Sequence, residues 1–365
     1  MENNVQKLPA YAKLSLILAG VLTFFYILVI GQDIIVPIVF AFIIAILLNP
    51  IVNFLCNKKV NRVVAIFIAL ILTISFLAGV IYLLISQLSM FSDSFPVFKE
   101  KFSAMFDELL KWVSHTFNIS ERKINVWINT KRTEGMEIST NVIGQTLGTI
   151  SGILVIVFLL PVYIFMILFY KSLLLEFISR LFKGNQHKIA EDVLFQSKGL
   201  IQTYLMGLLF EALIVATLNS VSLLIIGIQY AILIGIIGAL LNFIPYIGGL
   251  VAIALPMLVA LATGTPIDVL WVFIAYLFVQ FVDNNFIVPA IVASKVKVNA
   301  FVSIVVVLIG GAIWGIAGMF LSIPLIAIVK VIFDRIEPLK PFGYLLGDDM
   351  PDSSRKIFHF GKKKK

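Results

Sequence analysis

The chain alternates between long uncharged segments and short charged ones. The fully uncharged runs are Leu14–Gln32, Ile34–Asn57, Val63–Ser92, Asn141–Tyr170 and Val298–Val329. Two further apolar stretches carry a single acid each, Glu211 and Asp283. Because runs of about 18 or more apolar residues are typical of transmembrane helices, the pattern predicts an all-α, polytopic integral membrane helical bundle with about eight hydrophobic segments.

The composition supports a membrane protein. The chain is 60% hydrophobic and 13% charged, whereas soluble domains have about 25% charged residues. The net charge of +8 would suggest nucleic-acid binding in a soluble protein. Here basic loops and tails on the cytoplasmic side explain it better, with the terminal Lys362–Lys365 run touching anionic lipid headgroups. We therefore expect no nucleic-acid partner.

The charged loops predict how the chain crosses the membrane. The first span is expected to turn at Gly31–Asp33, and the second to return and end at the basic loop Asn57–Arg62. Basic loops favour the cytoplasm, so both this loop and the N-terminus are predicted to lie inside. The basic C-terminal tail is expected there too.

The segments group into six regions along the chain. Residues 1–91 hold the first three predicted spans, and residues 92–140 a polar, amphipathic helical region outside the bilayer. Residues 141–170 form the fourth span and residues 171–203 a cytoplasmic helical linker. Residues 204–333 are expected to form the C-terminal transport core, followed by a basic cytoplasmic tail, 334–365.

Two segments of this core are too long for one simple span. Ala231–Ala262 would measure about 48 Å as a continuous helix, against a hydrocarbon core of about 30 Å. Asn299–Phe333 is longer still. Each is either a long broken helix or a re-entrant hairpin, and paired broken segments are typical of a transporter's binding region. The hairpin alternative keeps Lys295 and Lys297 in the cytoplasm, as the positive-inside rule favours.

Helix-breaking residues mark both segments. In the first, Asn242, Pro245, Tyr246 and Gly248 interrupt the apolar run, and they either line a cavity or serve helix packing. In the second, the corresponding residues are Gly315, Gly318 and Pro324. A stripe of small residues on the fourth span, Gly144, Gly148 and Gly152, predicts close helix packing.

Asp283 is the leading candidate for function. A carboxylate inside the bilayer costs several kcal/mol unless it is protonated, paired or facing water, so an intramembrane acid is a functional candidate by default. Asn284 follows it, and Pro289 is expected to kink or break the helix and to free carbonyl groups nearby. The alternative is a structural cap or a buried hydrogen-bond partner. Glu211 is the second lone acid, either a proton or cation site or a protonated or interfacial residue.

Several chemistries find no support in the sequence. The single cysteine, Cys56, and three widely separated histidines give no metal-ligand spacing, and no cofactor is predicted. No hydrolase or metalloprotease motif is present, so an enzyme is not expected; a phosphate-binding loop of an ATP-driven pump is also absent. A channel would be expected to repeat pore-lining charges, which are not visible. A secondary transporter accounts best for the lone acids and the broken segments.

The order of short motifs resembles one family of bacterial membrane proteins, the autoinducer-2 exporter family. The motifs that carry the resemblance are Asp33–Pro37, Leu48–Pro50, Gly227–Ala231, Asn242–Gly248, Asp283-Asn284 with Pro289, Gly315–Gly318 and Ile323–Leu325. Together they cover nearly the whole chain. Two departures from the family pattern are Ala293, where glycine is common, and Asn299-Ala300, where a His-Pro-like pair is frequent.

The resemblance implies a multi-pass secondary transporter of the bacterial inner membrane. It implies export of a small furanone-like quorum-sensing signal such as autoinducer-2, with proton or cation coupling, or alternatively sodium–proton antiport. It also implies a homo-oligomer, with a pentamer among the expected forms. The lone acids and the break predict the residues of the substrate or ion path, which are Asp283, Asn284, Pro289, Asn242, Pro245, Tyr246, Gly248 and Glu211.

Overall fold

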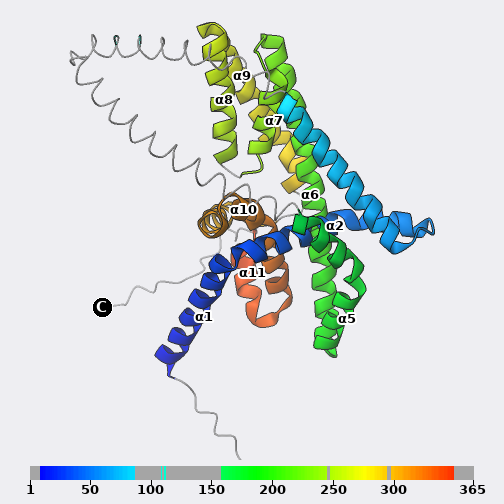
Figure 1. Ribbon diagram of the computed structural model, residues 1–365. Helices are drawn as coiled ribbons and strands as arrows, with labels where there is room; N and C mark the ends of the chain where they lie inside the picture. Colours follow the sequence, from blue (N-terminus) through cyan, green and yellow to red (C-terminus); the bar gives the residue numbers. More distant parts are fainter. Residues whose placement is uncertain are drawn as a thin grey trace, which may run out of the picture.

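The computed structural model describes residues 9–86, 108, 111, 158–244, 247–293 and 297–348. Every regular element within these ranges is helical (Figure 1). Six of the described helices are long and apolar enough to cross a membrane, or seven if one bent pair forms a single span. The prediction of a polytopic helical membrane protein is confirmed. The amphipathic region 92–140, apart from Glu108 and Lys111, lies outside the described residues.

The first two helices meet at an angle. α1 (Ala10–Ile30) and α2 (Gln32–Asn57) flank Gly31, whose φ and ψ of −83° and 7° are close to helical values. Its amide donates to Ile27 O at 2.8 Å, and its carbonyl accepts from Ile35 N at 2.8 Å. The chain therefore bends here, and the two helices diverge instead of lying side by side (Figure 1). The return predicted at Gly31 was wrong, because helical hydrogen bonding continues through the glycine.

Three helices form an N-terminal cluster around small residues. α2 packs against the helix Arg62–Ser86 and against the helix Phe158–Phe169, which bends by 60° into α5 (Lys171–Leu181). Its centre contains the buried alanines Ala41, Ala45, Ala65 and Ala69. Alanines four residues apart on facing helices let the backbones approach closely, which favours packing in lipid.

The longest helix organises the C-terminal half. α6 (Asn185–Ile226) has 42 residues, about 63 Å at 1.5 Å per residue. It contributes buried residues to three of the hydrophobic clusters. The other members of these clusters come from α2, α7 (Ala231–Leu241), α8 (Ile247–Thr263), α9 (Pro266–Val282), the π-helix η1 (Asp283–Ala293) and α10 (Ala300–Arg335). The boundary predicted at residue 203 falls inside this continuous helix, so the charged linker and the apolar core share one rigid element.

The first broken segment is a helical hairpin. α7 (Ala231–Leu241) and α8 (Ile247–Thr263) are separated by a turn beginning at Asn242. Ala231 and Ile234, at the start of α7, share a cluster with Val259 and Ala260, at the end of α8, so the helices are antiparallel (Figure 1). At 11 residues, α7 is about 17 Å long and too short to cross the bilayer alone. Of the two alternatives for Ala231–Ala262, the structure has the hairpin.

The second broken segment also folds back on itself. α10 (Ala300–Arg335) is interrupted by non-helical backbone at Trp314 and at Gly315, whose φ is +59°. Ser322 Oγ donates to Val306 O at 2.9 Å, although the two residues are 16 positions apart. In a continuous helix they would lie about 24 Å apart. The positive φ at Gly315, which an L-residue adopts only with strain, permits the reversal.

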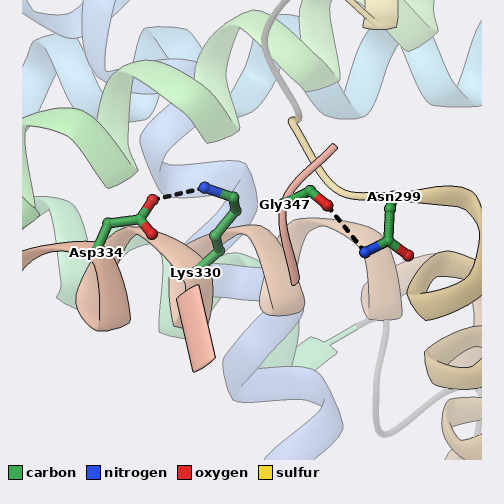
Figure 2. A network of polar contacts seen from close by, with 4 residues as sticks. All are labelled: Asn299, Lys330, Asp334 and Gly347. Atoms are coloured by element: carbon green, nitrogen blue, oxygen red, sulfur yellow. Dashed lines mark hydrogen bonds and ion pairs between the residues drawn. The ribbon is translucent and has the colours of Figure 1, made fainter. Parts of the chain in front are cut away.

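The two hairpins open at opposite ends of the bundle. α9 (Pro266–Val282) starts at the open end of the first hairpin, where Thr265 and Asp268 form a capping box, and η1 (Asp283–Ala293) continues it. α9 and η1 together are long enough for one membrane span, and Lys297 follows them. Lys297 and Lys330 of α10 line the same cavity. Figure 2 shows the closure of this end: Asn299 Nδ2 donates to Gly347 O at 2.9 Å, and Lys330 Nζ pairs with Asp334 Oδ2 at 2.6 Å. Gly347 follows the short helix α11 (Lys340–Leu346).

Thiol labelling checks this topology. In a Cys56→Ser background, single cysteines replace Ile267, which is exposed at the start of α9, or Lys297, one span away. With basic residues inside, an impermeant thiol reagent added to intact cells should label position 267, and position 297 only after permeabilisation. Ile267 is chosen because replacing Asp268 would remove the capping box.

The Cys56→Ser protein without a new cysteine is the control for background labelling. Equal labelling of both positions from outside would contradict the single α9–η1 crossing. The reverse pattern would contradict the predicted orientation.

Candidate functional site

Asp283 lies where the first hairpin's turn meets the junction of α9 and η1. Its side chain is only 3% exposed. Asn242, the first residue of the turn, donates from Nδ2 to Asp283 Oδ2 at 3.1 Å. The other carboxylate oxygen, Oδ1, is buried and has no hydrogen-bond partner in the described part of the chain. One oxygen of the carboxylate therefore accepts a hydrogen bond within the site, and the other is available for a further partner.

A short chain of amides supports the contact. Gln280 Nε2 donates to Asn242 Oδ1 at 3.4 Å, and Asn284 Nδ2 donates to Gln280 Oε1 at 3.4 Å. Gln280 was not among the predicted site residues. The signal that could have found it is a lone amide within an apolar span, one helical turn before the acid. Asn284, which was predicted, is exposed and contacts Asp283 only through this chain of amides.

The helix that follows Asp283 is widened. η1 is a π-helix of 11 residues that contains Pro289, an exposed residue. Proline lacks the backbone donor that an α-helical bond needs, and π-helical turns are often found at functional sites. The sequence predicted a kink or break at Pro289. The chain instead keeps its direction in a wider helix that begins at the acid itself.

Glu211, the second lone acid, faces this site from α6. It is 6% exposed, and Val215, one turn after it on α6, shares a buried cluster with Ile287, one turn after Asp283. None of the ion pairs in the described residues involves either acid. A pair of buried carboxylates without a basic partner is unfavourable when both are charged. The arrangement is therefore suited to holding a proton or a cation.

A second polar layer lies further along the same three helices. Asn219 of α6 and Tyr276 of α9 are 2% and 1% exposed. A Cβ atom on Gly238 of α7 would lie 3.3 Å from Asn219 Nδ2 and 3.4 Å from Tyr276 Oη. Asn219 Oδ1 and Tyr276 Oη have no hydrogen-bond partners among the described residues. The sequence analysis missed this layer, because an isolated Asn and Tyr in apolar spans are individually weak signals.

The hairpin's turn is held by aromatic and backbone contacts. Phe243 packs edge-on against Phe320 of α10, with ring centroids 6.1 Å apart, and Phe320 stacks on Phe40 of α2 at 5.9 Å. Gly248 is buried, and a Cβ atom there would lie 1.8 Å from Leu241 O. Pro245 and Tyr246 lie outside the described residues, so their predicted role stays a prediction.

The glycines of α10 have two different functions. Gly315 makes the reversal, whereas Gly318 packs so closely on Gly310 that a Cβ atom would lie 1.9 Å from Gly310 O. Pro324 is fully buried in the second arm. The stripe Gly144, Gly148 and Gly152 lies outside the described residues.

A cavity of about 400 Å³ lies between α6 and α10, at the end of the bundle shown in Figure 2. Its polar lining residues are Gln196, Thr203, Lys297, Lys330 and Asp334. Thr203 is followed on α6 by Glu211 and then Asn219, each eight residues further on. The helix thus carries polar groups from the cavity, past the acid pair, to the second polar layer.

The described residues contain no group of three or more His, Cys, Asp or Glu side chains that could hold a metal ion. The other polar groups near the two acids are amides and the phenol of Tyr276. This set suits a proton, a weakly bound monovalent cation or a hydroxyl-bearing solute better than a tightly held transition metal.

Comparison with known proteins identifies the family. The model of the "AI-2E family transporter" family matches residues 16–337. Among the similar proteins are "AI-2 transport protein TqsA" of Escherichia coli (strain K12), 25% identical over 87% of this chain and 90% of its own length, and "Putative transport protein YrrI" of Bacillus subtilis (strain 168), 28% identical over 82% and 86%. The YhhT protein of E. coli (strain K12) is 24% identical over 94% of both chains.

These matches and the helical bundle define a multi-span membrane protein of a bacterial transporter family. The chain belongs to the AI-2E family of transporters. The family resemblance stated from the motifs is confirmed.

Replacing Gly248 tests whether the turn is as tight as its contacts indicate. Gly248→Ala places a methyl group against Leu241 O, so the turn or its neighbours must shift at a cost of about 1–3 kcal/mol. We expect a lower thermal midpoint for the purified protein than for the wild type. The matched control is Gly79→Ala, since a Cβ atom at Gly79 meets nothing within 4 Å. Equal midpoints for the two variants would contradict the tight turn.

Proposed function

We propose that the protein is a secondary transporter that exports a small polar signalling molecule such as autoinducer-2, coupled to protons or cations. The observation that carries the proposal is the pair of buried acids, Asp283 and Glu211, beside the turn of a helical hairpin and without a basic partner among the described residues. An enzyme is not proposed, because neither the family nor the site supplies a catalytic constellation.

The buried acids support coupling on energetic grounds. An unpaired carboxylate in the bilayer costs several kcal/mol, so this pair favours an arrangement in which it shares a proton or a cation. When the site opens to water, that ion can leave and the carboxylates become hydrated. A binding site whose ion occupancy depends on access is the physical basis of coupled transport.

The hairpins support alternating access. The first hairpin opens at one end of the bundle and the second at the other, and they meet where Phe243 contacts Phe320. Broken helices near mid-membrane are the usual binding elements of secondary transporters. The cavity beside Lys297 and Lys330 would be the cytoplasmic entrance, and the layer of Asn219 and Tyr276 would lie on the outward side of the acids. The predicted path residues Asn284, Pro289, Asn242, Pro245, Tyr246 and Gly248 surround this route in the proposal.

The solute class is proposed from the relative TqsA, whose name assigns it to AI-2 transport. Asn219 Oδ1 and Tyr276 Oη, which have no hydrogen-bond partners among the described residues, suit a solute rich in hydroxyl groups that would supply these bonds. Sodium–proton antiport is the second candidate, and the proximity of two buried carboxylates favours it. The transport core would be the region 204–333.

The cellular setting follows from the same proposal. We place the protein in the bacterial inner membrane with both termini in the cytoplasm. Lys7 and Lys13 favour that side for the N-terminus, and the basic tail favours it for the C-terminus. We also propose a homo-oligomer, a pentamer being one form. The support is α1, because the apolar stretch of this helix buries none of its residues in the single chain.

Removing the charge of Asp283 should abolish coupling. Asp283→Asn keeps the shape of the side chain but can neither release a proton nor neutralise a cation. In proteoliposomes with an imposed pH gradient, we expect gradient-driven flux of autoinducer-2 or sodium to fall by at least about tenfold. Asp33→Asn, which removes an exposed carboxylate at the start of α2, should retain wild-type flux. Wild-type flux in purified Asp283→Asn would reject the coupling role.

The two acids should act as one unit. If they share one ion, Glu211→Gln and Asp283→Asn each disable the same site, and the double variant should transport no worse than the more impaired single variant. Additive losses would show that the acids act separately. Loading the vesicles with either autoinducer-2 or sodium distinguishes the two candidate functions, since only the transported species should respond to the pH gradient.

A further inference from the structure

A cluster of basic side chains lies at the end of the N-terminal three-helix cluster, far in sequence from Asp283. Arg62 begins the helix Arg62–Ser86, Lys171 begins α5, and Lys198 lies on α6. Lys171 Nζ donates to Asn49 Oδ1 of α2 at 3.0 Å. Arg62 donates to Leu168 O at 2.6 Å and to Ser172 Oγ at 3.3 Å. These hydrogen bonds thus join α2, the helix Arg62–Ser86, the helix Phe158–Phe169 and α5.

The cluster has no counter-charge within the described residues. Its hydrogen bonds go to neutral oxygens, and none of the ion pairs there includes Arg62, Lys171 or Lys198. Burial, followed by repulsion from Lys198 and Arg62, lowers the pKa of the Lys171 ammonium group. Three positive charges held together by fixed helices are unfavourable unless an anion binds among them.

Asn49 supplies a second and independent indication of an anion. It is 5% exposed, and its carbonyl oxygen accepts from Lys171. The amide nitrogen, Nδ2, is buried with no acceptor in the described part of the chain. A buried donor without a partner is rare in proteins and needs an explanation. An anionic oxygen beside Lys171 would satisfy this donor and neutralise the basic cluster at once.

The surroundings of the cluster indicate where that oxygen comes from. Arg62 is the first residue of one membrane-length apolar helix, and Asn49 lies about two turns before the end of another, so the cluster lies toward the level of the lipid headgroups. The adjoining α5 exposes large apolar side chains, among them Leu173 and Phe177. An amphipathic helix of this kind suits the membrane interface, where acyl chains would cover it.

We propose that Asn49, Arg62, Lys171 and Lys198 form a binding site for the phosphate group of an anionic phospholipid. Basic sites between transmembrane helices on the cytoplasmic side bind such headgroups. The bound lipid would join α2, the bend at Tyr170 and α6, and so hold the N-terminal helices against the long helix of the C-terminal half. This site is separate from the solute path and does not depend on the proposed transport function.

Lipid binding can be measured on the full-length protein in detergent. Phosphatidylglycerol and phosphatidylcholine are added at matched concentrations, and inorganic phosphate in a third series, while binding is followed by native mass spectrometry and by the thermal midpoint. We expect phosphatidylglycerol to bind and to raise the midpoint, and phosphatidylcholine and inorganic phosphate to do neither. Equal effects of the two lipids would overturn the site. An equal effect of inorganic phosphate would show a free-anion site and overturn the lipid assignment.

Variants locate the effect. Lys171→Gln with Lys198→Gln should weaken phosphatidylglycerol binding at least about tenfold, because each basic group near the headgroup contributes to attraction. Asn49→Asp places a carboxylate beside Lys171 and supplies the counter-charge from within the protein. That variant should fold without the lipid and lose the lipid-dependent rise in midpoint, which keeps the test decisive if the double variant fails to fold.

The matched control is Lys58→Gln with Lys59→Gln, which removes two charges from the neighbouring loop, where Lys58 lies over the Phe54 ring at 4.5 Å. It should retain nearly wild-type phosphatidylglycerol binding. If this control loses as much binding as the Lys171 and Lys198 variant, attraction is non-specific and the proposal fails. A wild-type rise in midpoint for Asn49→Asp would also overturn it.

Discussion

The hydrogen bond from Asn242 to Asp283 joins the parts of the C-terminal half on which its shape depends. It ties the turn of the α7–α8 hairpin to the point where α9 widens into η1. Non-helical backbone at membrane depth persists only where protein or a water-filled cavity surrounds it. The turn meets this condition by local bonds, such as Ile244 N to Leu241 O at 2.9 Å, and by the contact of Phe243 with Phe320. The same contacts that make the turn possible therefore place an amide against the buried acid.

Burial gives this acid its chemical character. Asp283 receives one hydrogen bond and faces a second carboxylate, Glu211, without a basic partner in the described residues. A stabilising salt bridge would hold the site in one state of charge. An acid pair without one favours a site that exchanges its ion as access changes, provided the hairpins can move. The stability of the fold comes instead from apolar and small-residue contacts, such as Gly235 of α7 against Ser220 of α6.

The helices of the N-terminal half and those of the C-terminal half pack together through different kinds of contact. The N-terminal helices meet through buried alanines, and their ends carry an excess of basic side chains. The C-terminal half folds two of its segments into hairpins, uses glycine both for a reversal and for close contact, and encloses its polar groups. α6 is in contact with both halves, since it packs on α2 and on the hairpin. Any movement of the hairpins would therefore change their contacts with this one long helix.

The sequence by itself determined the class of protein, the breaks near Asn242 and Gly315, and the two acids that stand alone in apolar spans. Hydropathy is a local property, and an apolar run of membrane length has few alternatives to a helix. The motifs likewise identified the family without any knowledge of contacts. Asn242 and Gly248 could be assigned to a break because helix-breaking residues act on their own backbone.

Only the tertiary structure decided which of these residues meet. Asp283 lies 41 residues from Asn242 and pairs with it because α7 and α9 both pack on α6, an arrangement that no local pattern encodes. Gln280, Asn219 and Tyr276 were missed for the same reason, since a lone polar residue shows its role only when its neighbours from other helices are known. Glycines were equally ambiguous: Gly315 reverses the chain and Gly318 packs, whereas Gly31 merely bends it. Glycine permits each of these conformations, and long-range contacts select one.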